Sequence, residues 1–199
     1  MKCIEELLLD KSLVSTYHHK LSEKNLIFYD TETTGILKDF SQILQCGSVL
    51  TDEGLNTLDE QNIGCAPLPW VIPQPMAMIT NKKIDLFKSN ISHYQMMKDL
   101  QMQWKQWSAE NPAIFITYNG HAFDEELVRR QFFWNLLEPY TTNTNGNGRL
   151  DLMLMIHNIA AFFSDEISMP LFEGGPGISY KLEHLSLIHI SEPTRQRVI

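Results

Sequence analysis

Two carboxylate side chains stand two positions apart near residue 30. Asp30 and Glu32 open the run 30–35, which ends at Gly35 and follows a short apolar segment. Because alternate residues of a strand point to the same side of a sheet, we expect both carboxylates to project into one space. Two carboxylates so close repel each other, and a divalent cation that takes hard oxygen ligands, Mg²⁺ or Mn²⁺, would relieve that repulsion. The plainer interpretation is an acidic strand-to-loop turn, since Asp, Thr and Gly are common turn residues.

A second acidic cluster follows about ninety residues later, between a predicted strand and a predicted helix. Asp124 comes where the helix should begin, and the helix dipole favours acids in the first turn. Its plainer role is an N-cap. We expect Glu125 and Glu126 to form a solvated first turn and His121 to be a loop histidine, so Asp124 is the candidate ligand of this cluster.

The segments that must position these residues are short apolar runs and amphipathic stretches. Apolar and β-branched content predicts strands at 25–30, 43–51, 58–63 and 113–118. Helical patterns are expected at 124–134 and 151–163, with a polar loop at 138–148, a Gly-rich turn at 173–179 and the start of one more helix at 180–185. Hairpin-type strands followed by alternating helices and strands predict an α/β fold with a mixed sheet and helices packed on it.

One helix carries the clearest pattern. Four prolines at 67–75 predict a rigid loop ahead of a short helix. Ser92 and Gln95 then have the spacing of a capping box. A core stripe is expected on this helix at Tyr94, Met97, Leu100, Trp104 and Trp107.

Composition limits the class of protein. A chain of 199 residues that is 43% hydrophobic can bury one sizeable core. Its apolar runs fall short of the roughly 20 residues that a membrane span needs. The three cysteines are not spaced for a zinc site or a disulfide framework, which favours a reducing cytoplasm. The net charge of −8 is unusual for a protein that binds nucleic acid directly, although bound cations would change the local charge.

Taken together, these segments resemble the DEDD exonucleases and, within the DEDDh (DnaQ-like) group, bacterial exonuclease I. The similarity rests on Asp-x-Glu-Thr-x-Gly at 30–35 and Asn-x-x-x-Phe-Asp at 119–124. Further matching segments occur in the same order at Ile72-Pro73-Gln74-Pro75, Ile79-Thr80, Glu138-Pro139-Tyr140, Arg149-Leu150-Asp151-Leu152 and Lys181-Leu182-Glu183-His184-Leu185. The resemblance covers about residues 25–185 and implies a ribonuclease H-like fold.

The resemblance also implies a reaction, the 3′–5′ hydrolysis of single-stranded DNA to mononucleotides with two Mg²⁺ or Mn²⁺ ions. On the matching positions, Asp30 would bridge both ions, Glu32 would bind the ion that holds the attacking water, and Asp124 would support the second through water. The residues implied to contact the terminal nucleotide are Thr33, Thr34, Gly35, Asn119 and Phe123. We expect a monomer in the bacterial cytoplasm that binds single-stranded DNA, has single-strand-binding protein as a candidate partner, and does not bind a membrane.

The third DEDDh motif, His-x-x-x-x-Asp, is absent from the sequence. Counting from His184, its base would fall near Arg197 and its acid near roughly position 202; His189 lies too early, and no Asp follows it. The stretch 187–195 resembles a translated sequencing-adapter tail. We therefore expect an N-terminal extension at 1–24, an incomplete exonuclease domain at 25–186 and a non-native tail at 187–199. Loss of a general base typically costs about 10²–10⁴ in rate, so low activity is expected.

Two other interpretations stay open. The chain could come from another DEDD nuclease, which acts on RNA ends or proofreads for a polymerase, and matched DNA and RNA oligonucleotides would separate these. It could also be an inactive module that only holds single strands, which tight metal-independent binding would favour.

Overall fold

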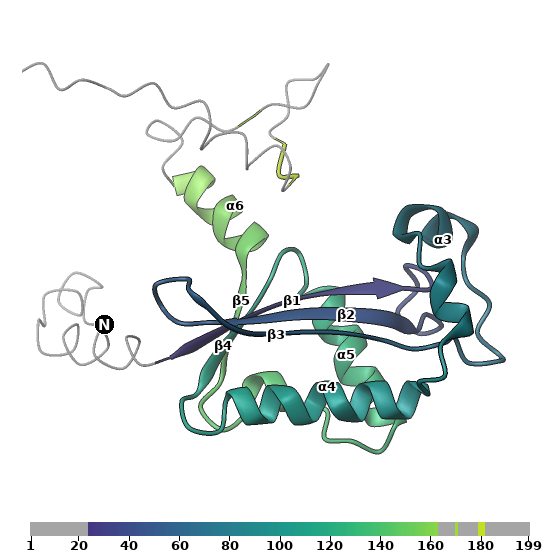
Figure 1. Ribbon diagram of the computed structural model, residues 1–199. Coiled ribbons are helices and arrows are strands. Elements are labelled where there is room, and N and C mark those ends of the chain that lie inside the picture. Colours follow the sequence, from purple (N-terminus) through teal and green to yellow (C-terminus); the bar gives the residue numbers. More distant parts are fainter. Residues whose placement is uncertain (1–23, 163–169, 171–178, 182–199) are drawn as a thin grey trace, which may run out of the picture. The chain divides into compact units, whose positions relative to one another are not determined.

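The computed structural model describes residues 24–162, 170 and 179–181 (Figure 1). Its elements, in chain order, are β1 (Asn25–Thr33), β2 (Ile43–Thr51), β3 (Thr57–Gly64), α3 (Pro75–Asn81), η1 (Ile84–Lys88), α4 (His93–Trp107), β4 (Ala113–Thr117), α5 (Asp124–Trp134), η2 (Thr141–Asn143), β5 (Gly148–Asp151) and α6 (Leu152–Phe162). The chain divides into two compact units between Leu150 and Asp151. Within these described ranges, no helix is both long and apolar enough to cross a membrane.

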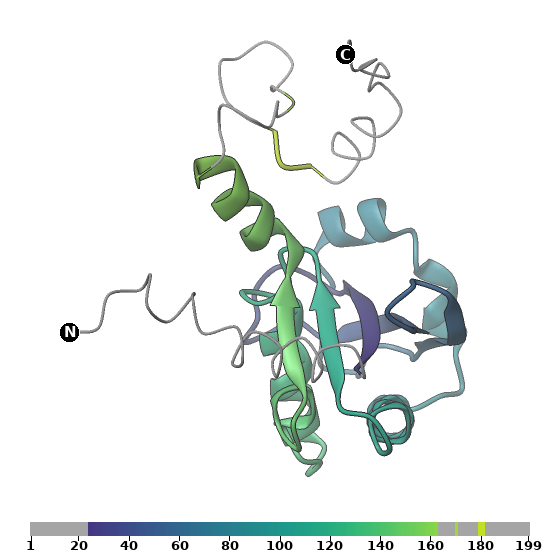
Figure 2. The same cartoon turned by 90° about the vertical axis from the view of Figure 1, so that its left-hand side faces the viewer.

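A five-stranded mixed sheet with the order β3-β2-β1-β4-β5 is the framework of the fold. Its middle strand, β1, pairs antiparallel with β2, which pairs antiparallel with β3. β1 also pairs with β4, and this pair is parallel, so the chain must cross over between them, which it does through α3 and α4. Figure 2 shows β4 and β5 side by side, with α4 seen end-on. The mixed α/β sheet predicted from the sequence is confirmed.

Helices α4 and α5 pack on one face of the sheet around a fully buried Trp104. The Trp104 ring lies 4.8 Å from the ring of Tyr29, 5.2 Å from that of Phe115 and 6.2 Å from that of Phe132, measured between centroids. Its indole N–H donates to Ser48 Oγ at 3.0 Å, so the polar end of the side chain is also satisfied. This residue therefore ties both helices to the strand that carries the first two acids.

The helix expected after Ser92 is present, with two differences in detail. The Ser92 hydroxyl accepts a hydrogen bond from the backbone N–H of Gln95 at 3.1 Å, as an N-cap does. The Gln95 side-chain amide donates to Asp99 at 2.7 Å, so it is engaged along the helix. Every member of the predicted core stripe is buried except Tyr94, which is 49% exposed. The prediction for Tyr94 is wrong because its neighbour His93 takes the buried position of the first turn.

The region before α6 also corrects the sequence prediction. Asp151 was expected to begin a helix, but it ends the short strand β5. Its carboxylate accepts hydrogen bonds from the backbone N–H groups of Met153 at 3.0 Å and Leu154 at 3.3 Å, and it thereby caps α6. A strand of four residues that starts at a glycine has too little alternation to be recognised from sequence.

Several predictions concern residues outside the described part of the chain. They are the extension at 1–24, of which only Lys24 is described, and the tail at 187–199. Most of the turn expected at 173–179 and of the helix expected at 180–185 also lie outside it.

Candidate metal centre

Asp30 and Glu32 lie on the same face of β1. The strand alternates between the buried residues Tyr29, Thr31 and Thr33 and the more exposed Asp30 and Glu32. Since β1 continues past the predicted end at Asp30, both carboxylates extend from strand backbone. Both therefore point away from the helix-covered face of the sheet.

Asp124 reaches the same stretch of β1 from α5. β4 pairs with β1 only as far as Phe28, so the second half of β1 extends beyond its neighbour. There the carboxylate of Asp124, which is 7% exposed, accepts a hydrogen bond from the hydroxyl of Thr31. The N-cap position of α5 belongs to Phe123, which makes no side-chain cap bond, so Asp124 is not an N-cap. The third acid is thus bonded to the residue between the first two.

The surroundings raise the pKa of all three carboxyl groups. Burial raises the pKa of Asp30. Burial also raises the pKa of Glu32, the negative charge of Asp30 adds to the rise, and the positive charge of Lys83 opposes it. Burial raises the pKa of Asp124 to about 6; the Thr31 hydroxyl opposes this rise, and the charge of Asp30 adds to it. In the absence of a cation, the ionised forms are therefore disfavoured here.

This donor set suits a hard divalent cation chemically, because carboxylate oxygens are the ligands that Mg²⁺ and Mn²⁺ prefer. Among the residues that the structure describes, however, no group of three or more His, Cys, Asp or Glu is arranged to hold a metal ion. Asp124 bonds to Thr31, whose side chain lies on the buried face of β1, whereas Asp30 and Glu32 lie on its other face. The charge of Asp30 nevertheless acts on both Glu32 and Asp124, so the three acids share one stretch of the strand.

The residues after β1 make hydrogen bonds within the protein. The Thr33 hydroxyl donates to the carbonyl oxygen of Gly35 at 2.8 Å. The Thr34 N–H donates to the carbonyl oxygen of Gln42 at 2.8 Å, and the Thr34 hydroxyl accepts from the Gln42 N–H at 2.8 Å. Both threonine side chains are buried, so their hydroxyls shape the loop itself.

The other two residues implied to contact a nucleotide lie on the loop between β4 and α5. Asn119 is exposed and has a φ of 61°, in the left-handed region that asparagine tolerates well. Phe123 is half-buried and packs against the core. The Lys38 ammonium group donates to the carbonyl oxygen of Ala122 at 2.9 Å. This bond joins the loop that follows β1 to the loop that precedes α5.

Glu125 corrects the expectation of a solvated first turn. It is 8% exposed and accepts hydrogen bonds from Arg149 at 2.6 Å and from the Thr142 hydroxyl at 3.4 Å. His121 Nε2, in the preceding loop, lies 3.9 Å from its second oxygen. Glu126 is partly exposed and pairs with two arginines of the same helix. A buried carboxylate needs such partners, and no sequence pattern connected Arg149 on β5 with Glu125.

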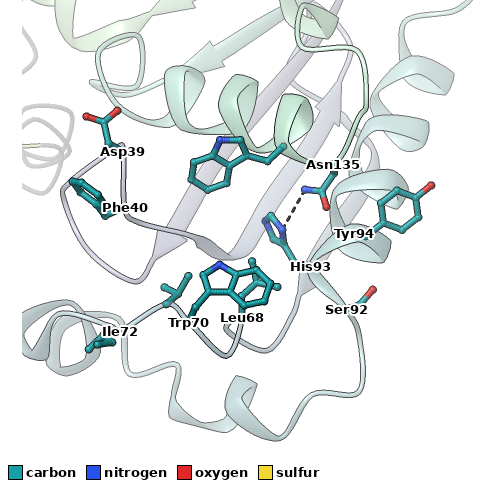
Figure 3. Close-up of a pocket in the computed structure, with 11 residues that line it drawn as sticks. Asp39, Phe40, Leu68, Trp70, Ile72, Ser92, His93, Tyr94 and Asn135 are labelled. Atoms are coloured by element: carbon teal, nitrogen blue, oxygen red, sulfur yellow. Dashed lines mark hydrogen bonds between the residues drawn. The ribbon is translucent and has the colours of Figure 1, made fainter.

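The structure also has a hollow of about 780 Å³ that the sequence did not indicate (Figure 3). Its lining is mostly apolar and aromatic, with a few polar side chains. It consists of Asp39, Phe40, Leu68, Trp70, Val71, Ile72, Ser92, His93, Tyr94, Trp134 and Asn135. His93 is 4% exposed; its Nε2 lies 2.7 Å from Gln131 Oε1, and its Nδ1 lies 3.2 Å from Asn135 Nδ2. Burial lowers the pKa of His93. None of the three acids of the candidate centre lines this hollow.

Comparison with known proteins connects the chain to one group of enzymes. No protein-family model matches it. It is 28% identical over 171 residues to exodeoxyribonuclease I of Buchnera aphidicola subsp. Schizaphis graminum, and 29% identical over 178 residues to that of subsp. Acyrthosiphon pisum. It is 25% identical over 182 residues to exodeoxyribonuclease I of Escherichia coli K12. These matches cover 84%, 84% and 82% of this chain, but 34%, 41% and 34% of the relatives, so the chain spans well under half of their length.

Solved structures agree in fold. The TM-score is 0.74 with an exonuclease I structure without ligand, at 22% identity over 83% of this chain and 37% of that one. It is 0.73 with E. coli exonuclease I in complex with a dT13 oligonucleotide, at 22% identity over 82% of this chain and 35% of that one. The chain is therefore homologous to the catalytic region of bacterial exonuclease I, and it has the fold of that enzyme's nuclease domain.

Proposed function

We propose that this chain carries the metal-binding part of a 3′–5′ exonuclease that hydrolyses single-stranded DNA to mononucleotides. The observation that carries the proposal is the grouping of three acids around one stretch of the middle strand, two on β1 and one on α5. Asp30 and Glu32 share the exposed face of β1, and Asp124 is bonded to the residue between them. Homology to exodeoxyribonuclease I supports phosphodiester hydrolysis as the reaction class.

The same three acids are the proposed ligands of two Mg²⁺ or Mn²⁺ ions. Such ions would lower the pKa of the attacking water and stabilise the leaving oxygen. Following the resemblance, Asp30 would contact both ions, Glu32 the ion at the attacking water, and Asp124 the other through water. The proposed contacts to the terminal nucleotide are Thr33, Thr34, Gly35, Asn119 and Phe123.

The proposed substrate and partners follow from the relatives. A dT13 oligonucleotide is bound in one structure of E. coli exonuclease I, which supports single-stranded DNA as the substrate. Another solved relative is an ExoI/SSB-Ct complex, which supports the C-terminal segment of SSB as a partner. We place this activity in bacterial DNA repair in the cytoplasm. The net charge of −8 is consistent with phosphate contacts that depend on bound cations.

Binding is the first test, because the 199 residues contain neither the histidine base nor the fourth acid that the resemblance implies. Fluorescence anisotropy of a labelled single-stranded DNA with a free 3′ end should show binding in Mn²⁺ that disappears in EDTA. Asp30→Asn should abolish this metal-dependent binding. Glu53→Gln is the matched control, because Glu53 is an exposed acid far from the candidate centre. It comes two residues after Thr51, and Thr51 pairs with Leu26 at the opposite end of β1.

Three outcomes would contradict the proposal in different ways. Equal binding of DNA by wild type and Asp30→Asn would show that these acids are not part of the binding site. Tight binding in EDTA would favour an inactive single-strand-binding module. Tighter binding of the matched RNA oligonucleotide would favour a nuclease that acts on RNA ends.

Hydrolysis is the second test. In Mg²⁺, a 5′-labelled oligonucleotide should shorten from its 3′ end, at a rate about 10²–10⁴ below that of a DEDD enzyme with its base. Mononucleotides released from the 5′ end would contradict the proposed polarity.

A further inference from the structure

The loop that follows β1 is attached to the segment around α3 by hydrogen bonds. The backbone N–H of Gln74 donates to the carbonyl oxygen of Thr34 at 2.7 Å. Gln74 Oε1 accepts from the backbone N–H of Ile36 at 3.1 Å. The Asn81 side-chain amide donates to the carbonyl oxygen of Thr33 at 2.9 Å. The loop backbone between residues 33 and 36 is therefore held from outside at three points.

Gly35 allows Gln74 to approach this closely. A Cβ atom at Gly35 would lie 2.6 Å from Cδ, 2.7 Å from Oε1 and 2.8 Å from Cγ of Gln74. Gln74 itself is extended, with φ −71° and ψ 134°, and stands between Pro73 and Pro75, which restrict the chain at that point. Although Gln74 occupies the N-cap position of α3, its side chain makes no cap bond and is directed to the loop instead.

The attached loop begins at an irregularity of β1. The register of the β1–β2 pair shifts between Glu32 and Thr33, which marks a bulge. Bulges re-aim side chains and are common beside active sites. The bond from Asn81 ends on the residue just after this shift, and the charge of Lys83, two residues further along, acts on Glu32. The segment from α3 to the start of η1 is thus bonded to the residue next to Glu32, and its Lys83 acts electrostatically on the Glu32 carboxylate.

We propose that Gln74 is a positioning residue for the metal centre, which fixes the direction of the Glu32 carboxylate by holding the loop 33–36 against α3. This inference rests on the proposed function. Groups that orient metal ligands without touching the metal typically contribute 10–100-fold in metal affinity. A residue that only stabilises the fold would change the unfolding temperature and leave the metal affinity unchanged.

The test is the Mn²⁺ affinity of the full chain, measured by isothermal titration well below the unfolding temperature. Gln74→Ala should weaken Mn²⁺ binding by about 10-fold or more. Gln103→Ala is the matched control, because it also removes a glutamine side chain that makes a hydrogen bond. Gln103 is on α4 and donates to Asp59 of β3. Asp59 pairs with Leu50, which lies away from the acids along β2. Circular dichroism should show the same secondary structure in all variants.

A double-variant cycle separates positioning from a general loss of stability. Gly35→Ala should also weaken Mn²⁺ binding, since its methyl group displaces the Gln74 side chain. The double variant Gly35→Ala/Gln74→Ala should bind no more weakly than the weaker single variant, because both changes act on the same contact. Effects that multiply would overturn the inference.

The outcomes also distinguish this inference from the proposed function. If Asp30→Asn loses Mn²⁺ binding while Gln74→Ala binds as wild type does, the metal centre stands and the positioning role is overturned. If wild type and Asp30→Asn bind Mn²⁺ equally, both ideas are overturned. Should Gln74→Ala not fold, Gln74→Met keeps most of the side-chain volume and removes the acceptor for Ile36, and hydrogen exchange at the Ile36 amide then reports the loss.

Discussion

Replacing Asp124 by asparagine should stabilise the metal-free protein at neutral pH while it removes a proposed metal ligand. The Asp124 carboxyl group is 7% exposed, and burial raises its pKa from 3.8 to about 6. An acid whose pKa is higher in the folded state binds protons more readily there. The folded state is therefore not penalised below about pH 4, it loses stability as the pH rises from about 4 to about 6, and the loss is complete once Asp124 has ionised in the folded state.

The magnitude follows from the size of the shift. A rise of about two pKa units, at about 1.4 kcal/mol for each unit, corresponds to a cost of about 3 kcal/mol above pH 6. Asparagine has nearly the same shape, can still bond to the Thr31 hydroxyl and carries no charge. Asp124→Asn should therefore gain up to about 3 kcal/mol in free energy of unfolding at pH 8 and only about 1 kcal/mol at pH 4.5.

Urea denaturation in EDTA at these two pH values measures the difference. Asp85→Asn, at an exposed residue of η1, is the matched control. Saturating Mn²⁺ should then stabilise wild type more than Asp124→Asn, because a ligand stabilises the state that binds it. If Asp124→Asn were less stable than wild type at pH 8, or equally stabilised at both pH values, the reasoning from burial would be refuted.

Three further substitutions test the elements that position the site. Trp104→Ala should lower the free energy of unfolding by about 3–5 kcal/mol because it empties the middle of the core, and a loss below about 1 kcal/mol in urea denaturation would contradict its place there. Ser92→Ala should lower the free energy of unfolding by about 1 kcal/mol, because the Gln95 N–H loses its acceptor. Ser92→Asp provides a new acceptor, so thermal unfolding should show wild-type stability for this variant. Arg149→Met should lower the free energy of unfolding at pH 8 by about 2 kcal/mol, since it leaves the buried Glu125 without its arginine partner. The double variant Arg149→Met/Glu125→Gln should recover most of this loss. An equal loss in the single and the double variant would argue against the ion pair.

Features that depend on neighbours in sequence were the ones that could be predicted. The placement of Asp30 and Glu32 on one face needs only the two-residue period of a strand. The start of α5 at Asp124 follows from the acidic first turn and the helical pattern behind it. The mixed sheet follows from the order and lengths of the elements.

Features that depend on distant residues could not be predicted. The fit of Gln74 against Gly35 joins segments 39 residues apart, and each residue has an ordinary explanation, an extended residue between prolines and a turn glycine. The burial of Glu125 depends on Arg149, which becomes its partner only once β5 has joined the sheet. The bond from Thr31 to Asp124 likewise joins β1 to α5, beyond the last pair that β1 makes with β4. Local patterns carry no information about such contacts, since the fold creates them.

Anomalous diffraction from crystals of the chain grown with Mn²⁺ would test most directly whether these acids form a metal centre. We predict Mn²⁺ within coordination distance of Asp30 and Glu32, on the exposed face of β1, and its loss in Asp30→Asn crystals. Saturating Mn²⁺ with no anomalous signal at these two residues, or with a signal unchanged by Asp30→Asn, would contradict the central claim.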